Sequence, residues 1–387
     1  MRFHLCGLPH TVASKRFCSC AYTQKHLNMA KMMRSLGHQV IDYSAEGSEA
    51  DADEHVSVIT AEEQERFFGG GNWHERAFTV SYDPSMPYWR LANYRTAQGI
   101  RERQQQGDFV LLIAGTTQRS IADQVGGALA LTVEYGVGYY GTFALYRVFE
   151  SYTHQACVYG QQSPDPDGRL YDAVIPNSFD PADFPFHDEK SGYLLYLARS
   201  TRRKGIAIAI ETARAAEMPL IIAGAGARCE NGRLETDDGL AIELPPGASY
   251  LGPAGAVQRA RLMGRARALI QPTLYMEPFG GNVAEAALCG TPAITTDYAA
   301  FSETVLQGVT GYRCRTLDQF VRAAELVGSL EPREIHERAV ERYSLDRVKW
   351  LYQEYFEQLT DLWGEGWPTL TRRRPRELPW DAPSIEP

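Results

Sequence analysis

The side chains best placed for chemistry lie in the stretch Tyr275–Asp297, YMEPFGGNVAEAALCGTPAITTD. A Gly-Gly pair opens an alanine-rich helix there, and Gly290 and Pro292 end it. A helix that begins at a glycine-rich turn leaves its first N–H groups free, and the helix dipole adds positive charge, so this end attracts phosphate. Glu277 and Glu285 bracket the turn, and carboxylates accept hydrogen bonds from hydroxyls. The stretch therefore predicts a site for a sugar nucleotide.

The composition limits the class of protein. A chain of 387 residues exceeds one ordinary hydrophobic core, so two domains are expected. A hydrophobic content of 44% and a charged content of 22% are those of a soluble globular protein. The net charge of −9 argues against a nucleic-acid-binding footprint over the whole surface, although a local basic groove stays open.

The cysteines and the apolar runs indicate the compartment. No apolar run approaches the ~20 residues of a membrane span, and no signal-peptide core follows Met1. The seven cysteines are odd in number and scattered, and the sequence has no Asn-x-Ser/Thr site. Because disulfides and N-glycans mark oxidising compartments, we expect a cytoplasmic protein.

Strands and helices alternate along both halves of the chain. Apolar runs bounded by turn residues, such as Asp108–Gly115 and Tyr193–Ala198, predict buried strands. The alternation predicts an α/β protein with a doubly wound parallel sheet in each half, and ligands bind such sheets at the carboxyl ends of the strands. We also expect a long loop over 46–80, a strand over 129–133, and a helix within 139–159 that ends before Gly160.

Three motifs follow one another in the second half. Arg199, Lys204 and Gly205 form an Arg-x4-Lys-Gly motif in YLARSTRRKG. Glu277 and Glu285 form a Glu-x7-Glu motif with Pro-Phe-Gly after its first member, and GTPAI closes the stretch. In these motifs the chain resembles the family 4 glycosyltransferases, whose pattern its second half follows almost throughout.

The first half resembles that family less. It shares the LGHQV end of the first helix and an Ile-Pro-Asn-x-x-Asp crossing at 175–180. Its VEYGVGY and RVFESY runs are similar to a less characterised subgroup found in bacteria and their phages.

The resemblance implies the GT-B fold, in which two Rossmann-like doubly wound domains face a cleft. We place the boundary in the proline-containing segment Ala173–Phe184, which gives an acceptor-side domain over 1–177 and a nucleotide-sugar-binding domain over 178–343. A helix over 344–363 would cross back onto the first domain, before a weakly ordered tail over 364–387.

The resemblance also implies a role for each motif residue. Arg199 and Lys204 would bind the nucleotide diphosphate, since Arg binds phosphate bidentately and Lys adds a compact charge. Glu285 would accept hydrogen bonds from the ribose and Glu277 from the donor sugar. Gly224, in the AGAGA stretch, would form a tight turn beside the base. Backbone N–H groups after Glu277 would reach the sugar or phosphate, namely those of Phe279, Gly280, Gly281 and Asn282.

Glu134 is the clearest departure from the family pattern. Family members commonly carry a histidine after the equivalent of the strand over 129–133, where it touches the donor sugar. We expect Glu134 to bind a sugar hydroxyl, to stabilise positive charge on the anomeric carbon, or to take the acceptor's proton. The alternative is a loop carboxylate that faces water or pairs with Arg147.

The loop before the first helix faces donor and acceptor in the family. It supplies four polar candidates for acceptor contact, which an ordinary solvated loop would also explain: His10, Ser14, Lys15 and Arg16.

The predicted reaction is a retaining transfer from a nucleoside-diphosphate sugar, with UDP or GDP as the expected nucleotide and no cofactor. Arg199, Lys204, Glu277 and Glu134 are the candidate catalytic residues. The Asp-x-Asp pair at 51–53 lies in an acidic loop of the wrong half, so we expect no metal. The acceptor would be a hydroxyl of a glycan, a small molecule or a lipid.

Three alternatives stay open at this point. The chain could act on a hydroxymethylated base in phage-type DNA, which the acidic balance disfavours. It could be a GT-B phosphorylase or epimerase, or a sugar-nucleotide binder without catalysis. The sequence does not identify the sugar, the acceptor or the oligomeric state.

Overall fold

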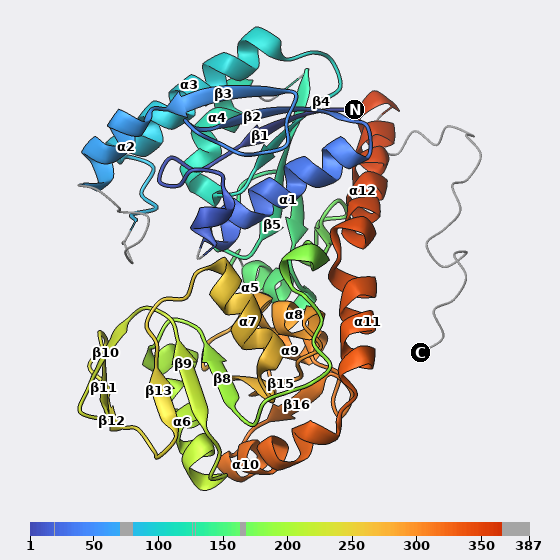
Figure 1. The fold of residues 1–387 in the computed structure, drawn as a ribbon. Coiled ribbons are helices and arrows are strands. Elements are labelled where there is room, and N and C mark those ends of the chain that lie inside the picture. The colour runs from blue at the N-terminus through green and yellow to red at the C-terminus, as the bar shows by residue number, and fades with distance from the viewer. Residues whose placement is uncertain (19, 70–79, 126, 128, 163–167, 366–387) are drawn as a thin grey trace.

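The chain folds into two parallel sheets covered by helices, and the last two helices lie along the second half and then the first (Figure 1). The computed structural model describes residues 1–365 apart from residues 19, 70–79, 126, 128 and 163–167. The weakly ordered tail expected over 364–387 lies, from residue 366 onward, outside the described residues.

The first sheet has seven strands in the order β3-β2-β1-β4-β5-β6-β7, and all of its strand pairs are parallel. β4 (Asp108–Leu112) is buried along its whole length, as expected for a strand covered on both faces. The other strands are β1 (Arg2–Cys6), β2 (Gln39–Ala45), β3 (Glu54–Ile59), β5 (Ala130–Val137), β6 (Tyr146–Phe149) and β7 (Ala173–Val174).

Helices connect these strands, and the short 3₁₀ helices carry the letter η. In chain order they are η1 (Lys15–Phe17), α1 (Ala21–Ser35), α2 (Ala61–Phe68), α3 (Pro87–Arg103), η3 (Gly115–Gln118), α4 (Arg119–Val125) and α5 (Tyr152–Gln162).

The second sheet has six parallel strands in the order β13-β9-β8-β14-β15-β16. They are β8 (Leu194–Leu197), β9 (Leu220–Ala223), β13 (Ala248–Tyr250), β14 (Ala268–Gln271), β15 (Ala293–Thr296) and β16 (Gly311–Cys314). A separate antiparallel sheet is inserted between β9 and β13, formed by β10 (Ala227–Glu230), β11 (Arg233–Thr236) and β12 (Ala241–Glu243).

The helices of the second half alternate with these strands and then continue to the end of the described chain. They are η4 (Pro181–Asp183), η5 (Arg202–Lys204), α6 (Ile206–Ala215), α7 (Ala256–Arg265), α8 (Gly281–Leu288), α9 (Phe301–Thr304), α10 (Leu317–Leu326), η6 (Val327–Ser329), α11 (Pro332–Tyr343) and α12 (Leu345–Glu365).

The structure corrects two expectations in the first half. The segment expected to be a long loop over 46–80 contains β3 and α2, and α2 begins at a capping box in which Thr60 and Glu63 bond each other's backbone N–H. The expected helix within 139–159 is preceded by β6 and, as α5, continues past Gly160 to Gln162. Glycine lowers helix propensity without ending a helix that is otherwise packed.

Helix α12 crosses back onto the first half, as the predicted fold requires. Its Phe356 is fully buried, with its ring 4.7 Å from that of Phe3 and 5.1 Å from that of Phe109. Ser344 accepts a hydrogen bond from the Arg347 N–H and so caps the start of the helix. The C-terminal helix therefore completes the core of the N-terminal sheet.

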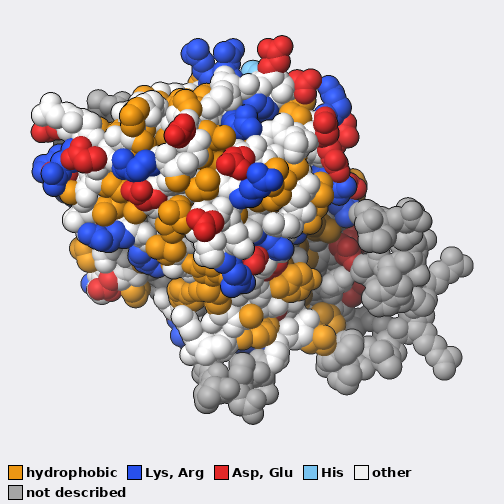
Figure 2. Space-filling view, turned by 90° about the horizontal axis from the view of Figure 1, so that it is seen from below, with side chains coloured by type: hydrophobic (Ala, Val, Ile, Leu, Met, Phe, Trp, Pro, Cys, Tyr) orange, Lys and Arg blue, Asp and Glu red, His pale blue; other side chains and the backbone are white. Residues whose placement is uncertain are grey.

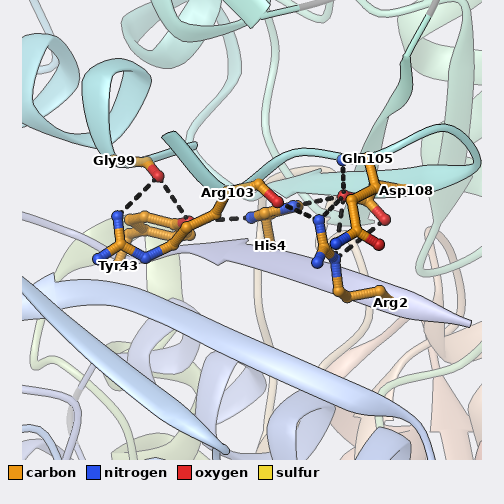
Figure 3. A network of polar contacts seen from close by, with 7 residues as sticks. All are labelled: Arg2, His4, Tyr43, Gly99, Arg103, Gln105 and Asp108. Atoms are coloured by element: carbon orange, nitrogen blue, oxygen red, sulfur yellow. Dashed lines mark hydrogen bonds and ion pairs between the residues drawn. The ribbon is translucent and has the colours of Figure 1, made fainter. Parts of the chain in front are cut away.

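A polar network lies at the amino end of β1 and joins it to β2, β4 and α3 (Figure 3). Arg2 donates to Asp108 at 2.6 Å, and His4 bridges Asp108 at 3.0 Å and the Tyr43 hydroxyl at 2.9 Å. Burial raises the pKa of Asp108, but the hydrogen bonds from Arg2 and His4 lower it, so the pKa of this carboxyl stays below its usual range. Satisfied buried networks favour one strand register, so this one helps to fix the first sheet.

The first sheet ends with β7 at Val174 and the second begins with β8 at Leu194. The predicted boundary at 177 falls in the segment between them. It stays a prediction.

Candidate active site

The predicted donor residues come together at one edge of the second sheet. β8, β9 and β14 are neighbours in that sheet and run parallel, so their carboxyl ends lie side by side. Arg199 follows β8, Gly224 follows β9, and the Glu277 loop follows β14. We call this edge, with the loops that leave it, the carboxyl edge.

Lys204 and Glu277 form an ion pair that a tyrosine bridges. Lys204 Nζ donates to Glu277 Oε2 at 2.8 Å and to the Tyr275 hydroxyl at 2.6 Å. That hydroxyl donates in turn to Glu277 Oε1 at 3.0 Å. Burial, and then the Glu277 carboxylate, raise the pKa of Tyr275, so its hydroxyl keeps its proton. Tyr275 is a residue that sequence reasoning missed, because the motif fixes only the glutamate beside it.

Arg199 is exposed at the end of β8, and within the described part of the chain no ion pair holds its guanidinium. Its stem packs against the glycine turn after β9, since a Cβ at Gly226 would meet Arg199 Cγ at 3.0 Å. A Cβ at Gly224 would lie 1.9 Å from the Ala198 carbonyl oxygen. Glycine is therefore required where the ends of β8 and β9 approach each other.

The turn at Gly280 and Gly281 opens α8 as predicted. Gly280 has φ 81° and precedes the first helical residue, and no side chain caps that end of the helix. A Cβ on Gly280 would lie 2.6 Å from the Phe301 ring. The Phe279 side chain points away into the core, 3% exposed, while the Asn282 amide donates to the Leu197 carbonyl and ties α8 to β8. Only the backbone of these residues is thus available to a ligand's phosphate or sugar.

Glu285 lies one turn into α8 and forms an ion pair with Arg259 of α7 at 2.6 Å. Arg259 also donates to the Asn282 side-chain oxygen at 3.1 Å. Sequence reasoning missed Arg259, because an arginine in the first turns of an amphipathic helix is usually solvated.

Glu134 does not lie in a loop, and the prediction that it follows the strand is wrong. It lies within β5 and is fully buried. Its Oε2 accepts hydrogen bonds from the N–H groups of Phe143 and Ala144, both at 2.8 Å, and its Oε1 accepts one from Tyr139 at 3.2 Å. Burial raises its pKa, and these hydrogen bonds act against that rise.

The alternative interpretation of Glu134 as a partner of Arg147 is also wrong, because Arg147 pairs with Asp172. The carboxylate of Glu134 instead holds the backbone of the loop between β5 and β6. Its burial gives no support to direct contact with a sugar.

The four acceptor candidates differ in exposure. His10 is 3% exposed, packed edge-on against Tyr82 and Trp89, and Ser14 caps η1 by accepting from the Arg16 N–H. Lys15 is exposed and pairs at 2.5 Å with Asp183 of the second half, and Arg16 is exposed. His10 and Ser14 therefore serve packing and capping, which corrects their assignment as acceptor contacts.

The two halves meet beside the Glu277 loop. Ser151 Oγ, at the start of α5, donates to the Pro278 carbonyl at 2.6 Å. Glu303 of α9 accepts from the N–H groups of Tyr152 and Thr153 at 3.0 and 2.7 Å. A carboxylate from the second half thus caps a helix of the first, as carboxylates at helix starts do.

Neither a metal centre nor a membrane-spanning helix is found in the part of the chain that the structure describes. Among those residues, no cluster of three or more His, Cys, Asp or Glu side chains is arranged to hold a metal ion. Within the same ranges every helix is too short or too polar to cross a membrane.

The second half matches a known family. Residues 182–343 match the model described as "Glycosyl transferases group 1". Over 159 residues the chain is 31% identical to the glycogen synthase of Mycobacterium tuberculosis, which covers 38% of this chain and 36% of that protein. Over 102 residues it is 32% identical to sucrose synthase 2 of Hordeum vulgare, covering 25% and 12%. The chain thus spans little more than a third of these relatives at most.

Solved structures resemble almost the whole chain. A glycosyltransferase involved in avilamycin A biosynthesis aligns with a TM-score of 0.64 at 16% identity, covering 93% of this chain and 98% of that one. Anabaena HepE, in complex with UDP and glucose, aligns at 0.60 and 13%, covering 92% and 100%. The sucrose-phosphate synthase of Thermosynechococcus elongatus aligns at 0.60 and 14%, covering 93% and 99%. At these identities the likeness shows the fold, and the fold is the GT-B fold predicted from the sequence. Over residues 182–343, the chain is thus similar to the glycosyl transferases group 1 family.

Proposed function

We propose that this chain is a retaining, metal-independent glycosyltransferase that transfers a sugar from a nucleoside-diphosphate sugar to a hydroxyl acceptor. The observation that carries the proposal is the Lys204–Tyr275–Glu277 cluster, which stands at the carboxyl edge between the exposed Arg199 and the uncapped start of α8. Cations and a helix end suit a diphosphate, and a carboxylate suits sugar hydroxyls.

Each part of the donor has a group to bind it. Arg199 and Lys204 would hold the diphosphate, with the backbone N–H groups at the start of α8 beside it. Glu277 would accept hydrogen bonds from the donor sugar and Glu285 from the ribose. Gly224 would form the tight turn beside the nucleotide base, where β8 and β9 end.

The cluster is arranged before a donor arrives. An ammonium has three N–H groups, and Lys204 uses two of them on Tyr275 and Glu277, which leaves one for a phosphate oxygen. Each Glu277 oxygen accepts one hydrogen bond from these partners and keeps a lone pair for a sugar hydroxyl. Groups that are already in position need no reorganisation during the reaction. This preorganisation is the main source of electrostatic stabilisation of a transition state.

The chemistry follows from the charges. As the bond to the anomeric carbon breaks, negative charge grows on the leaving diphosphate, and Arg199, Lys204 and the start of α8 stabilise it. We propose that the acceptor attacks from the face that the diphosphate leaves, and that a diphosphate oxygen takes the acceptor's proton. The cations supply the charge that a metal ion supplies in other transferases, so we propose no metal and no cofactor.

We propose UDP or GDP as the nucleotide of the donor. Anabaena HepE, which shares the fold, has been solved in complex with UDP-glucose, with a TM-score of 0.58. We also propose a cytoplasmic location, because all seven cysteines are free in the structure, as in a reducing compartment.

The face of the molecule drawn in Figure 2 gives no support to transfer onto DNA. Figure 2 shows the end of the molecule formed by the second half, where acidic and basic side chains are interspersed with apolar ones and no broad basic patch stands out. The net charge of −9 points the same way.

The test is a transfer assay with radiolabelled UDP- and GDP-sugars against glycans, lipids, small hydroxyl acceptors and hydroxymethylated DNA, in the presence of EDTA. We expect transfer to a hydroxyl outside DNA, unaffected by EDTA, with the anomeric configuration of the donor kept in the product by NMR. An inverted product or a loss of activity in EDTA would refute the corresponding part of the proposal. Phosphorolysis, epimerisation without an acceptor, or binding without turnover would refute transfer itself.

A further inference from the structure

Arg259 makes the contacts that set the position of Glu285. Its Nη2 donates to Glu285 Oε2 at 2.6 Å and to Asn282 Oδ1 at 3.1 Å. The two side chains of the ion pair are only 18% and 16% exposed. The pair therefore lies in a shielded place, where the strength of an ion pair is less reduced by water than on an open surface.

The ion pair belongs to a chain of contacts that ends at β8. The Asn282 amide, whose oxygen accepts from Arg259, donates through its nitrogen to the Leu197 carbonyl. Leu197 is the last residue of β8, and Arg199 stands two residues beyond it. Arg259 thus connects α7, α8 and the strand that carries the predicted phosphate ligand.

The position of Arg259 is unfavourable unless Glu285 offsets it. A cation near the start of a helix opposes the helix dipole, and α8 begins one residue before Asn282. Burial lowers the pKa of Arg259, while the charge of the Glu285 carboxylate and its hydrogen bond raise it; the net shift is upward, so the arginine stays charged.

The geometry leaves one oxygen of Glu285 for a ligand. Oε2 is bonded to Arg259, while within the described residues no hydrogen bond reaches Oε1. A carboxylate held at one oxygen has lost most of its rotamer freedom and can present the other oxygen in a fixed direction. Lys204 and Tyr275 also fix Glu277, but each bonds a different one of its two oxygens.

We infer that Arg259 is a positioning residue for the nucleoside half of the donor: it fixes Glu285 so that the free oxygen accepts from the ribose hydroxyls. The inference rests on the proposed function, because it presumes that a nucleotide binds at the carboxyl edge. Arg259 acts on the nucleoside, whereas Lys204 acts on the diphosphate.

The test measures nucleotide binding to the full chain by calorimetry. UDP, GDP and ADP are compared first. The nucleotide that binds most tightly is then compared with its 2′-deoxy form and with the corresponding monophosphate. Arg259→Met keeps the length and removes the charge, and Arg259→Lys keeps the charge and removes the planar fork. Arg261→Met is the matched control, since Arg261 is exposed on the same helix. Thermal unfolding checks that each variant folds.

For Arg259→Met we expect about tenfold weaker binding of the diphosphate and of the monophosphate alike, as for loss of a hydrogen bond to a charged group. The preference for the ribose over the 2′-deoxyribose form should shrink, and Arg259→Lys should lie between wild type and Arg259→Met. In a Glu285→Gln background, Arg259→Met should add little further loss. Arg261→Met should bind as wild type does.

An unchanged ribose preference in Arg259→Met, or a loss confined to the diphosphate, would overturn the inference. If Arg259→Met does not fold, an unchanged preference of Arg259→Lys for the ribose over the 2′-deoxyribose form would overturn the inference in the same way. If wild type binds none of the three nucleotides, the proposed function fails and this inference with it. If wild type binds but Glu285→Gln keeps the full ribose preference, the role of Glu285 fails while the diphosphate assignments stand.

Discussion

At the scale of single residues, the bridge from Lys204 through Tyr275 to Glu277 is the chemical centre of the proposed donor site. The Tyr275 hydroxyl lies 2.6 Å from Lys204 Nζ and 3.0 Å from Glu277 Oε1. Arg203 and Lys204 also lie over its ring, each 4.7 Å from the centre. The ring thus orients the cations, and the hydroxyl orients the carboxylate.

Tyr275→Phe separates these two roles, because it keeps the ring and removes the hydroxyl. We expect kcat/KM to fall about 10- to 100-fold, as when hydrogen bonds to charged groups are lost, with little change in Tm. Tyr298→Phe is the control, since that hydroxyl bonds the Thr273 carbonyl nearby. Equal activity of Tyr275→Phe and wild type would remove Tyr275 from the site.

His10 predicts a pH dependence of stability. Burial lowers its pKa from 6.5 to about 4, so the unfolded chain takes up a proton before the folded one does. The stability that this group contributes is present above pH 6.5 and is lost as the pH falls towards 4, by up to about 3 kcal/mol. Urea unfolding of wild type and His10→Leu at pH 7, 5.5 and 4.5 checks this.

We expect His10→Leu to lose less stability on acidification than wild type does. Some dependence will remain, because burial also lowers the pKa of His4 and of His154. An identical slope in both proteins would contradict the assignment of the effect to His10.

Residue types alone could not separate the exposed from the buried polar groups. The places of Arg199, Lys204 and Glu277 after strand ends, and of Glu285 in the helix that follows, were predictable because the motif spacing follows the alternation of strands and helices. Glu134 was not, because its burial depends on the loop that returns over it to β6. Lys204 reaches Glu277 and Arg259 reaches Glu285 from other elements, so no local pattern could indicate these two pairings.

At the scale of elements, the connection from η5 to α6 has to pass very close to the loop after β14. Gly205 has φ 76°, and a Cβ there would lie 1.9 Å from the Pro272 carbonyl oxygen. This close approach sets Lys204 opposite Glu277. The close approach thus explains why the Arg-x4-Lys-Gly motif ends in glycine: no larger residue fits at position 205.

Gly205→Ala should destabilise the fold by about 2–4 kcal/mol, from the left-handed backbone together with the clash. Gly239→Ala is the matched control, since Gly239 has φ 81° and a Cβ there would meet nothing within 4 Å. It should cost only about 1–2 kcal/mol. Chemical denaturation gives both values, and equal losses would contradict the argument from close approach.

The alternation of strands and helices was readable because buried parallel strands give continuous apolar runs. Several short elements with mixed polarity were not predicted. β10 and β11 are joined by Asn231 and Gly232, both with positive φ, a turn that commonly marks a hairpin. β3 and α2 were also missed, although Thr60 and Glu63 spell a capping box in the sequence.

At the scale of the whole molecule, the contact between the halves lies next to the donor loop. Ser151 bonds the Pro278 carbonyl, and Glu303 caps α5 from the other half (Figure 1). Lys31 of α1 pairs with Asp180 beyond the first sheet, at 2.6 Å. The hydrogen bond of Ser151 joins the first half directly to the residue after Glu277.

Glu303→Ala should destabilise the molecule by about 1–2 kcal/mol, the usual cost of losing a helix cap. We also expect a larger radius of gyration by small-angle scattering, because the cap spans the two halves. Glu334→Ala serves as control, since Glu334 pairs with Arg338 of its own helix α11. A Glu303→Ala protein with the stability and dimensions of wild type would show that this contact does not hold the halves together.

The central claim is that the carboxyl edge binds the two halves of a nucleotide donor separately. Calorimetry with UDP and UMP on wild type, Lys204→Ala and Glu285→Ala tests it most directly, with GDP and GMP in parallel. We predict that Lys204→Ala weakens binding of the nucleoside diphosphate at least tenfold and leaves binding of the monophosphate nearly unchanged. Glu285→Ala should weaken binding of both. Wild-type affinity of both variants for both ligands would contradict the claim.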